Sequence, residues 1–402
     1  MASASLAFLT LVAGGILLIP AVIFAVQCLT GSLPLRGRVY PKIERNRRPA
    51  VAVLVPAHNE ESGIRPTLAA IRRQLLDRDR LIVIADNCSD RTAQIARAEG
   101  AEVVERFDTE RRGKGFALDA GIRYLRQAPA EIVLLVDADC LLGANAIERL
   151  VEMVVATGRP AQSCNLMTAP EGAALTHAVA EFAFLVKNYV RPLGLLRLGL
   201  PCQVTGTGIA VPWPLLERVN TASSNRVEDM KLGLDFAEAG RATQFCPEAR
   251  ITSQFPLSKE GADSQRRRWE GGHLGMIRAE LRSLLHPRTF RNPARLALTL
   301  DLLIPPLTLL AMLLAAVFLA ALVLAIATGA LWPLAVAATN LLLVAVATVA
   351  AWSVHGRKAL PAAILYKIPL YVVWKLTLYP RAMIGGDGWV RTDRGKAADR
   401  HI

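Results

Sequence analysis

Uncharged apolar residues fill the beginning and much of the last third of the chain, whereas the middle alternates between short apolar runs and amphipathic segments. Residues 1–35 contain no charged side chain, and a second uncharged tract runs from Leu302 to Val354. A helix needs about 20 apolar residues to cross a bilayer core of about 30 Å. The first tract therefore predicts one transmembrane anchor. The second, broken near its middle by "TGALWP", predicts two transmembrane helices over 302–328 and 331–354.

The residues around the first apolar tract favour a retained anchor over a cleaved signal peptide. No basic stretch precedes the tract, and the basic segment "RGRVYPKIERNRR" follows it in the manner of a stop-transfer sequence. We therefore expect a transmembrane anchor over 1–35 and a basic juxtamembrane linker over 36–49.

Basic residues near the apolar tracts predict the orientation of the chain. They follow the first tract, precede the second within 286–301, and follow it in "HGRK". Basic segments next to membrane spans stay on the cytoplasmic side. We expect an integral protein of the cytoplasmic (inner) membrane whose middle domain faces the cytoplasm, with 286–301 as an interfacial linker.

The segment 360–382 is rich in aromatic residues but is interrupted by Lys367 and Lys375, and the tail 383–402 is basic. A basic tail that stays in the cytoplasm favours an interfacial or re-entrant helix over 360–382. A fourth crossing is the alternative, because lysine side chains can extend toward the ends of a span.

Residues 50–285 have the alternating pattern of an α/β domain. Strands are predicted at "AVAVLVP", "RLIVIAD", "AEVVER" and "EIVLLVD", with helices between them at "GIRPTLAAIRRQLL", "SDRTAQIARAEG" and "GFALDAGIRYLRQ". Continuous apolar strands separated by amphipathic helices predict a mainly parallel sheet that is covered on both faces. Ligands of such sheets bind beyond the carboxyl ends of the strands.

Polar and acidic residues follow three of these strands, in "PAHNE", "DNCSD" and "DADC". Each group alone is explained by turns or helix caps, but three of them at one edge of a sheet favour a binding site. Asp137 and Asp139 are two residues apart, so in an extended segment both carboxylates point to one face. Two hard oxygen donors suit Mg²⁺ or Mn²⁺, which also bridge to substrate phosphates.

The net charge of +13 has two interpretations. Nucleic-acid binding is one of them, but the basic residues cluster beside apolar spans, which favours attraction to anionic lipid headgroups. No nucleic-acid partner is therefore expected. The six cysteines show no metal-ligand spacing and are expected to be reduced thiols in a cytoplasmic domain.

Six motifs in order, "VPAHNE", "ADNCSD", "RGKGFALDAG", "DAD", "VED" and "QRRRW", resemble those of the family 2 glycosyltransferases, which have the GT-A fold. The resemblance covers about residues 50–280. "QRRRW" is similar to the Q-x-x-R-W pattern of the membrane-embedded group, which includes cellulose, chitin, hyaluronan and poly-N-acetylglucosamine synthases and ceramide glucosyltransferase. The resemblance implies an α/β, Rossmann-like GT-A domain with transmembrane helices on both sides.

The resemblance also implies where the nucleotide-sugar and metal bind. Asp86 would contact the uracil or ribose, and Lys114 would reach the nucleotide. Asp137 and Asp139 would hold the diphosphate and its Mg²⁺ or Mn²⁺. The remaining residues placed beside the nucleotide are Pro56, Asn59 and Glu60.

Further motifs of the resemblance concern the transfer itself. Asp229 of "VED" would be the catalytic base, and Val227 stands where many synthases have a threonine. Chemistry supports these roles, because a departing diphosphate needs cationic groups and an attacking hydroxyl needs a carboxylate to take its proton. The residues expected to bind the pyrophosphate or the acceptor are Glu228, Gln265, Arg268 and Trp269.

We expect an inverting membrane glycosyltransferase that transfers a hexose from a UDP-sugar to a growing polysaccharide at the cytoplasmic membrane face. One alternative is the transfer of a single sugar to a lipid acceptor, as in a ceramide glucosyltransferase or on a polyprenyl-linked glycan. Another is a catalytically silent subunit that binds nucleotide-sugar. The expected partners are a UDP-sugar donor, a glycan or lipid-linked acceptor and membrane lipids, while a polysaccharide-export partner or a homo-oligomer is left open.

Overall fold

The computed structural model describes the chain except residues 1, 35–39, 170–174, 223–226, 257–258 and 368–402. The chain forms two compact units. The α/β unit comprises the described residues of 35–170 and 200–269, and the helical unit comprises those of 1–34, 171–199 and 270–390.

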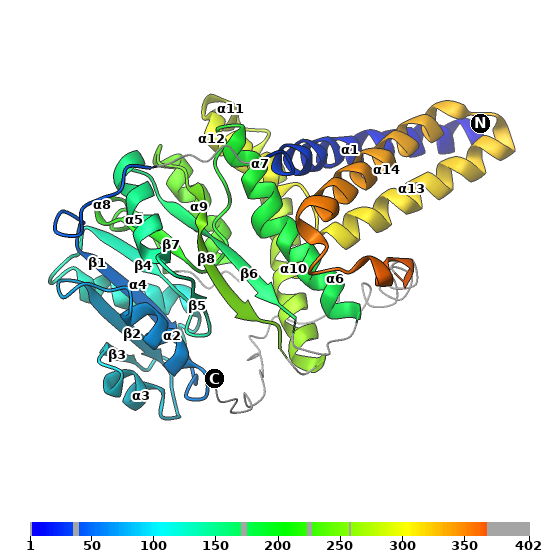
Figure 1. Ribbon diagram of the computed structural model, residues 1–402. Helices are drawn as coiled ribbons and strands as arrows, with labels where there is room; N and C mark the ends of the chain where they lie inside the picture. Colours follow the sequence, from blue (N-terminus) through cyan, green and yellow to red (C-terminus); the bar gives the residue numbers. More distant parts are fainter. Residues whose placement is uncertain (1, 35–39, 170–174, 223–226, 257–258, 368–402) are drawn as a thin grey trace. The chain divides into compact units, whose positions relative to one another are not determined.

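A mixed eight-stranded sheet forms the centre of the α/β unit (Figure 1). Its strand order is β3-β2-β1-β4-β7-β6-β8-β5. Strands β1 to β4 pair in parallel, as do β6 and β8, whereas β7 is antiparallel to β4 and β6, and β5 is antiparallel to β8. The mainly parallel sheet expected from the sequence is therefore confirmed, with two antiparallel strands added. The strands are β1 Val51–Ala57, β2 Arg80–Asp86, β3 Glu102–Arg106, β4 Ile132–Leu135, β5 Leu141–Leu142, β6 Ala161–Thr168, β7 Ile209–Pro212 and β8 Gln244–Gln254.

Successive residues of the central strands pack into two separate hydrophobic cores, one on each face of the sheet. In β1, Val53 and Val55 belong to the core that α2 and α5 complete, and Leu54 belongs to the core of α4 and α9. Both faces of the strand are apolar, so amphipathic helices must cover both. The helices of this unit are α2 Ile64–Arg72, α3 Thr92–Ala98, α4 Lys114–Leu125, α5 Ala146–Thr157, α8 Trp213–Leu216 and α9 Glu228–Glu238.

Three helices of the helical unit are long and apolar enough to cross a membrane, as the sequence predicted. They are α1 Ala2–Gly31, α13 Leu307–Thr328 and α14 Leu331–Ala351, the last continued by the π-helix η2 Trp352–Gly356. Helix α10, Lys259–Ser283, begins in the α/β unit and continues past its boundary at Trp269. The other helices of this unit are α6 Leu175–Leu185, η1 Val186–Val190, α7 Arg191–Arg197, α11 Pro287–Arg291, α12 Pro293–Leu302 and η3 Ala362–Lys367.

The end of α1 packs closely on η1 and α7. A Cβ atom on Gly31 or Gly194 would lie 2.1 or 2.0 Å from a backbone oxygen of the facing helix, so glycine permits this contact. A buried polar network lies beside it: Arg191 donates to Gln27 Oε1 at 2.8 Å and pairs with Asp301 Oδ1 at 2.7 Å. Losing one partner would leave a buried charge uncompensated, so the network holds α1, α7 and α12 together.

The α/β unit differs in extent from the expected domain 50–285, which stays a prediction. Residues 175–197 belong to the helical unit, where Phe182 and Val186 pack into a core with residues of α1 and α14. The apolar side chains of residues 175–197 pack against the apolar helices α1 and α14. The α/β unit is therefore built from two stretches of sequence.

The second apolar helix begins at Leu307, five residues after the expected start at 302. Pro305 and Pro306 separate it from α12, because proline interrupts a helix from within. Of the expected segment 360–382 only the residues up to 367 are described, and the tail 383–402 lies outside the described residues.

Candidate active site

The acidic pair predicted from the sequence lies just beyond the carboxyl end of a central strand. Strand β4 ends at Leu135, and Asp137 and Asp139 follow it in a loop rather than in the strand itself. The backbone N–H of Asp137 donates to Thr207 Oγ1 at 2.9 Å. The chain is therefore held where it leaves the sheet, and both carboxylates are half-buried.

Asp137, Asp139 and Cys140 offer ligand atoms that lie within 4.8 Å of one another. Burial, together with the charges of Asp139 and Asp137, raises the pKa of the Cys140 thiol well above its ordinary value. Cys140 therefore stays a neutral thiol beside the two carboxylates. Two carboxylate groups are hard oxygen donors, which fit Mg²⁺ or Mn²⁺ better than a thiolate-binding metal.

Lys114 begins α4 and connects this acidic loop to the rest of the site. Its Nζ forms an ion pair with Asp137 Oδ1 and donates to the carbonyl oxygen of Gly206 at 2.6 Å. Burial alone would lower the pKa of Lys114, but the carboxylates of Asp137 and Glu228 outweigh that effect and raise it. Lys114 is therefore a fixed positive charge at neutral pH.

Glu228 and Asp229 occupy the first turn of α9, where the helix dipole favours negative charge. A Cβ atom on Gly206 would lie 3.4 Å from Asp229 Oδ2 and 4.0 Å from Lys114 Nζ, so both groups converge on this glycine. Burial, followed by the charge of Asp229, raises the pKa of Glu228 to about 7, against the opposite effect of Lys114. Near neutral pH, Glu228 is thus partly protonated.

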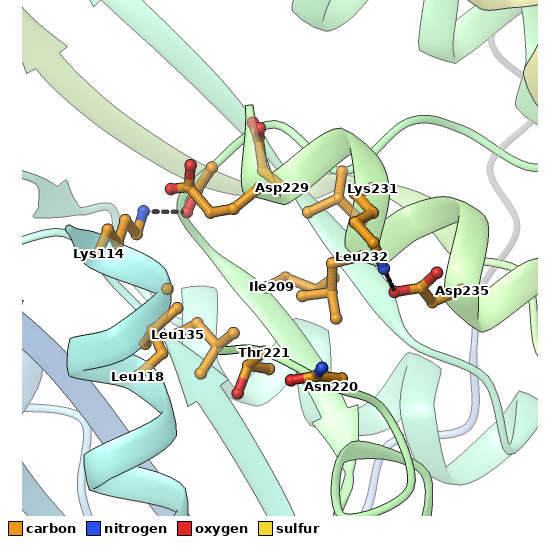
Figure 2. A pocket seen from close by; sticks show the side chains of 14 residues that line it. Lys114, Leu118, Leu135, Ile209, Asn220, Thr221, Asp229, Lys231, Leu232 and Asp235 are labelled. Carbon is orange, nitrogen blue, oxygen red and sulfur yellow. Dashed lines mark hydrogen bonds and ion pairs between the residues drawn. The ribbon is translucent and has the colours of Figure 1, made fainter. Parts of the chain in front are cut away.

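A pocket in the α/β unit runs from these charged groups toward the core (Figure 2). Lys114 on α4 faces the first turn of α9, which carries Asp229. Lys231 and Asp235, an ion pair at 2.6 Å, line the pocket further along α9. The pocket therefore joins a charged end to an apolar interior formed by Leu118, Leu135, Val204, Ile209 and Leu232.

The loop 205–208, with the sequence Thr-Gly-Thr-Gly, is a part of the site that sequence reasoning missed. Gly206 accepts from Lys114, Thr207 accepts from the Asp137 amide, and the Gly208 N–H donates to Leu135 O at 2.8 Å. Both glycines have positive φ angles, of 81° and 70°. In the sequence, two glycines before a short apolar run indicate only a turn. The loop contacts the site largely through backbone atoms, which leave no signal in the sequence.

Gly208 is required by its conformation and by its surroundings. A Cβ atom there would lie 2.0 Å from Ser163 Oγ and 2.4 Å from Ile251 Cδ1. We expect Gly208→Ala to lower the free energy of unfolding by roughly 2–4 kcal/mol, because strain and overpacking add. Gly240→Ala is the matched control, since Gly240 has φ 73° but nothing within 4 Å of the added carbon. We expect it to cost only about 1 kcal/mol, and equal losses in thermal unfolding of the two variants would contradict this account.

Asn59 and Glu60 connect the loops that follow β1 and β2. Asn59 has a φ of 53°, and its Oδ1 accepts from the Ser89 amide at 2.8 Å. The Glu60 amide donates to Thr92 Oγ1 at 2.8 Å. These contacts show how the two loops are held, and they leave the expected nucleotide contacts of Asn59 and Glu60 as predictions.

Asp86 ends β2 and is 6% exposed. Its Oδ1 accepts from Arg106 Nη1 at 2.5 Å and from Asn87 Nδ2 at 3.1 Å. Arg106 also pairs with Asp108 at 2.9 Å, so it ties the end of β2 to the loop before α4. Arg106 was not foreseen, because it lies twenty residues from Asp86 and meets it only through the pairing of β2 with β3.

The remaining predicted residues lie elsewhere. Pro56 is in β1 beyond the last residue that pairs with β4, where its missing N–H costs no hydrogen bond with that strand. Gln265, Arg268 and Trp269 share one face of α10 by their spacing, and Gln265 is 5% exposed. Among the described residues, none of these four lines the pocket of Figure 2.

Residues 49–272 match the model of the family described as glycosyltransferase-like family 2. The match covers more than half of the chain, which therefore belongs to this family. Over 258 residues the chain is 26% identical to the probable glycosyltransferase YdaM of Bacillus subtilis, covering 60% of this chain and 59% of that protein. It is 32% identical over 116 residues to the 4,4'-diaponeurosporenoate glycosyltransferase of Staphylococcus haemolyticus, covering 28% of this chain and 30% of the relative. The chain thus spans less than two thirds of the length of these curated relatives.

The fold is similar to that of the mannosyltransferase PcManGT from Pyrobaculum calidifontis, whose structure was solved in complex with GDP-Man and Mn²⁺. The TM-score is 0.53 and the identity 21%, and the match covers 85% of this chain and 98% of the other. This likeness concerns the fold. It confirms the GT-A architecture with a mostly parallel sheet that the sequence predicted.

Proposed function

We propose that the protein is an inverting membrane glycosyltransferase that transfers a hexose from a UDP-sugar to an acceptor hydroxyl. One observation carries the proposal: Lys114 and Asp229 converge on Gly206, while Lys114 also holds Asp137 of the acidic pair. A cation, the Asp229 carboxylate and the acidic pair Asp137 and Asp139 are thereby gathered beyond the ends of the strands, where such sheets bind ligands.

In this mechanism the acceptor oxygen attacks the anomeric carbon while the bond from that carbon to the diphosphate breaks. Asp229 takes the proton of the acceptor hydroxyl, and the bonding electron pair leaves with the diphosphate. Lys114 stabilises the charge that develops on the leaving group. Attack opposite to the leaving group inverts the anomeric configuration and gives a β-linked product from an α-linked donor.

Asp137 and Asp139 are the residues that would hold Mg²⁺ or Mn²⁺, since both are half-buried carboxylates of one short loop. When bound, the ion neutralises charge on the diphosphate. Asp86, Asn59, Glu60 and Pro56 remain the proposed nucleotide-binding residues. Gln265, Arg268 and Trp269 remain proposed for the pyrophosphate and the acceptor.

We propose a growing polysaccharide as the acceptor and the cytoplasmic membrane face as the place of transfer. The charge pattern around the apolar helices supports this orientation, and the "QRRRW" motif supports the synthase group. The second candidate is the transfer of one sugar to a lipid acceptor. The apolar side chains that line the pocket beside Asp229 favour it, as do the three candidate spans found in the described part of the chain.

The test uses membrane vesicles that contain the full chain, supplied with labelled UDP-sugars and GDP-mannose and with Mg²⁺ or Mn²⁺. We expect label from one UDP-hexose to enter a ladder of oligomers. One sugar on an extractable lipid would support the second candidate. Transfer from GDP-mannose alone would contradict the proposed donor, and no transfer from any sugar would contradict the proposed function.

A further inference from the structure

A buried glutamine on β6 holds the loop 205–208 at two points. Gln162 is 1% exposed, and its Oε1 accepts from the Thr205 amide at 3.0 Å. Its Nε2 donates to the Thr207 carbonyl at 2.8 Å and to Ser163 O at 3.2 Å. One side chain thus spans the loop on both sides of Gly206.

The position of Gln162 is itself fixed by strand pairing. It lies opposite Ile209 in the β6–β7 ladder, directly after the loop, and opposite Phe245 of β8. Asn165, on the same strand and 6% exposed, adds a third contact by donating from Nδ2 to Thr205 O at 3.2 Å. The strand therefore provides a rigid support from which the loop is held.

Each of the last three loop residues connects to the acidic strand end or to its cation. Thr207 Oγ1 accepts from the Asp137 amide at 2.9 Å, and Gly208 N donates to Leu135 O at 2.8 Å. Gly206 O accepts from Lys114 Nζ at 2.6 Å. Displacement of the loop would therefore move both the backbone of Asp137 and the ammonium group of Lys114.

We propose that Gln162 is a positioning residue for the metal and diphosphate site, acting through the loop 205–208. The proposal rests on the function proposed above, which assigns a metal to Asp137 and Asp139 and the diphosphate to Lys114. Gln162 contacts neither the proposed metal ligands nor Lys114. It fixes the loop whose Gly206 carbonyl accepts from Lys114 and whose Thr207 hydroxyl accepts from the Asp137 amide.

The loop also offers Lys114 a second hydrogen-bond acceptor, which matters when Asp137 binds a metal ion. Asp137 is paired with Lys114, so a cation that binds Asp137 competes with the ammonium group. Gly206 O gives that ammonium a second partner, so it is not left unpaired when Asp137 turns to the metal. Without Gln162, the Gly206 carbonyl moves away from Lys114, and the Asp137 amide is held less firmly by Thr207. Both effects weaken metal binding.

Supporting groups of this kind change metal affinity by about 10–100-fold when they are removed. We therefore expect Gln162→Leu to weaken Mn²⁺ binding by at least about 10-fold. Gln162→Glu keeps the shape and the acceptor for the Thr205 amide, but as a carboxylate it loses the donor to Thr207 O, and we expect weaker Mn²⁺ binding in this variant too.

The experiment measures free Mn²⁺ by electron paramagnetic resonance during titration of the purified full chain in lipid nanodiscs, without donor sugar. Gln74→Leu is the matched control. Gln74 also uses both ends of its amide, with Gly143 O at 3.1 Å and with the Ile147 amide in the first turn of α5 at 3.2 Å, but it has no part in the loop 205–208. Both leucine variants are expected to lower the melting temperature, whereas only Gln162→Leu is expected to weaken Mn²⁺ binding.

Equal Mn²⁺ affinities for the wild type, Gln162→Leu and Gln162→Glu would overturn the inference, as would an equal loss in Gln74→Leu. Absence of Mn²⁺ binding in the folded wild type would instead contradict the proposed metal site itself. If neither Gln162 variant folds, Thr207→Val tests the same connection, because it removes the acceptor of the Asp137 amide with little change in volume. Weaker Mn²⁺ binding in Thr207→Val supports the inference, and unchanged binding overturns it.

Discussion

Asp229→Asn is expected to reduce the turnover number for sugar transfer by about 10³-fold, within the range of 10²–10⁴ usual for the loss of a general base. Asparagine is nearly isosteric with aspartate but cannot accept the proton of the attacking hydroxyl. Binding of nucleotide and metal should change by less than about threefold, since the proposed role begins only when the hydroxyl reacts.

The matched control for this substitution is Asp235→Asn. Asp235 lies on the same helix, lines the same pocket and pairs with Lys231 at 2.6 Å. We expect this variant to retain turnover within about threefold, because an exchange of one partly exposed ion pair has a small effect. Rates are measured as the release of UDP and as the incorporation of labelled sugar. Full transfer activity in Asp229→Asn, or equal losses in both variants, would contradict the role of Asp229 as the base.

Removal of the metal is expected to abolish transfer. EDTA should lower the rate to background, and added Mn²⁺ or Mg²⁺ should restore it, because the diphosphate leaves poorly without a cation to neutralise its charge. Asp139→Asn should weaken Mn²⁺ binding by at least about 100-fold, since even residues that only support a ligand contribute 10–100-fold. The measurements are transfer rate against metal concentration and Mn²⁺ binding to the purified protein.

Asp119→Asn is the matched control for the metal prediction. Asp119 lies on α4, the helix that Lys114 begins, and pairs with Arg123 at 2.7 Å one turn along the helix. Exchange of this pair should leave Mn²⁺ affinity unchanged, because surface pairs of this type contribute little. A rate that persists in EDTA, or Mn²⁺ binding that survives Asp139→Asn, would refute the metal site.

The sequence predicted the strands and site residues whose signal lies within a short stretch of the chain. The run "RLIVIAD" predicts a buried strand, and β2 has the same bounds, 80–86. Asp137 and Asp139 were expected at a strand end because a continuous apolar run stops immediately before them. Lys114, Glu228 and Asp229 were expected from the resemblance of their motifs, and the structure brings all three to one pocket.

The parts that could not be predicted depend on contacts between distant segments. Gln162 reaches Thr207 across forty-five residues, and Arg106 meets Asp86 through strand pairing. Neither contact leaves a periodic or compositional signal. Residues 175–197 lie in the helical unit although they fall inside the expected domain 50–285. An apolar helix inside an α/β domain and one that packs on other apolar helices have the same local pattern, so the sequence does not separate the two.

The most direct test of the central claim is a structure of the full chain with UDP and Mn²⁺. We expect Mn²⁺ to be bound by the carboxylates of Asp137 and Asp139 and by the diphosphate, with Lys114 turned to a diphosphate oxygen and still held by the Gly206 carbonyl. A diphosphate bound away from Lys114, or Mn²⁺ bound without either aspartate, would contradict the proposed site.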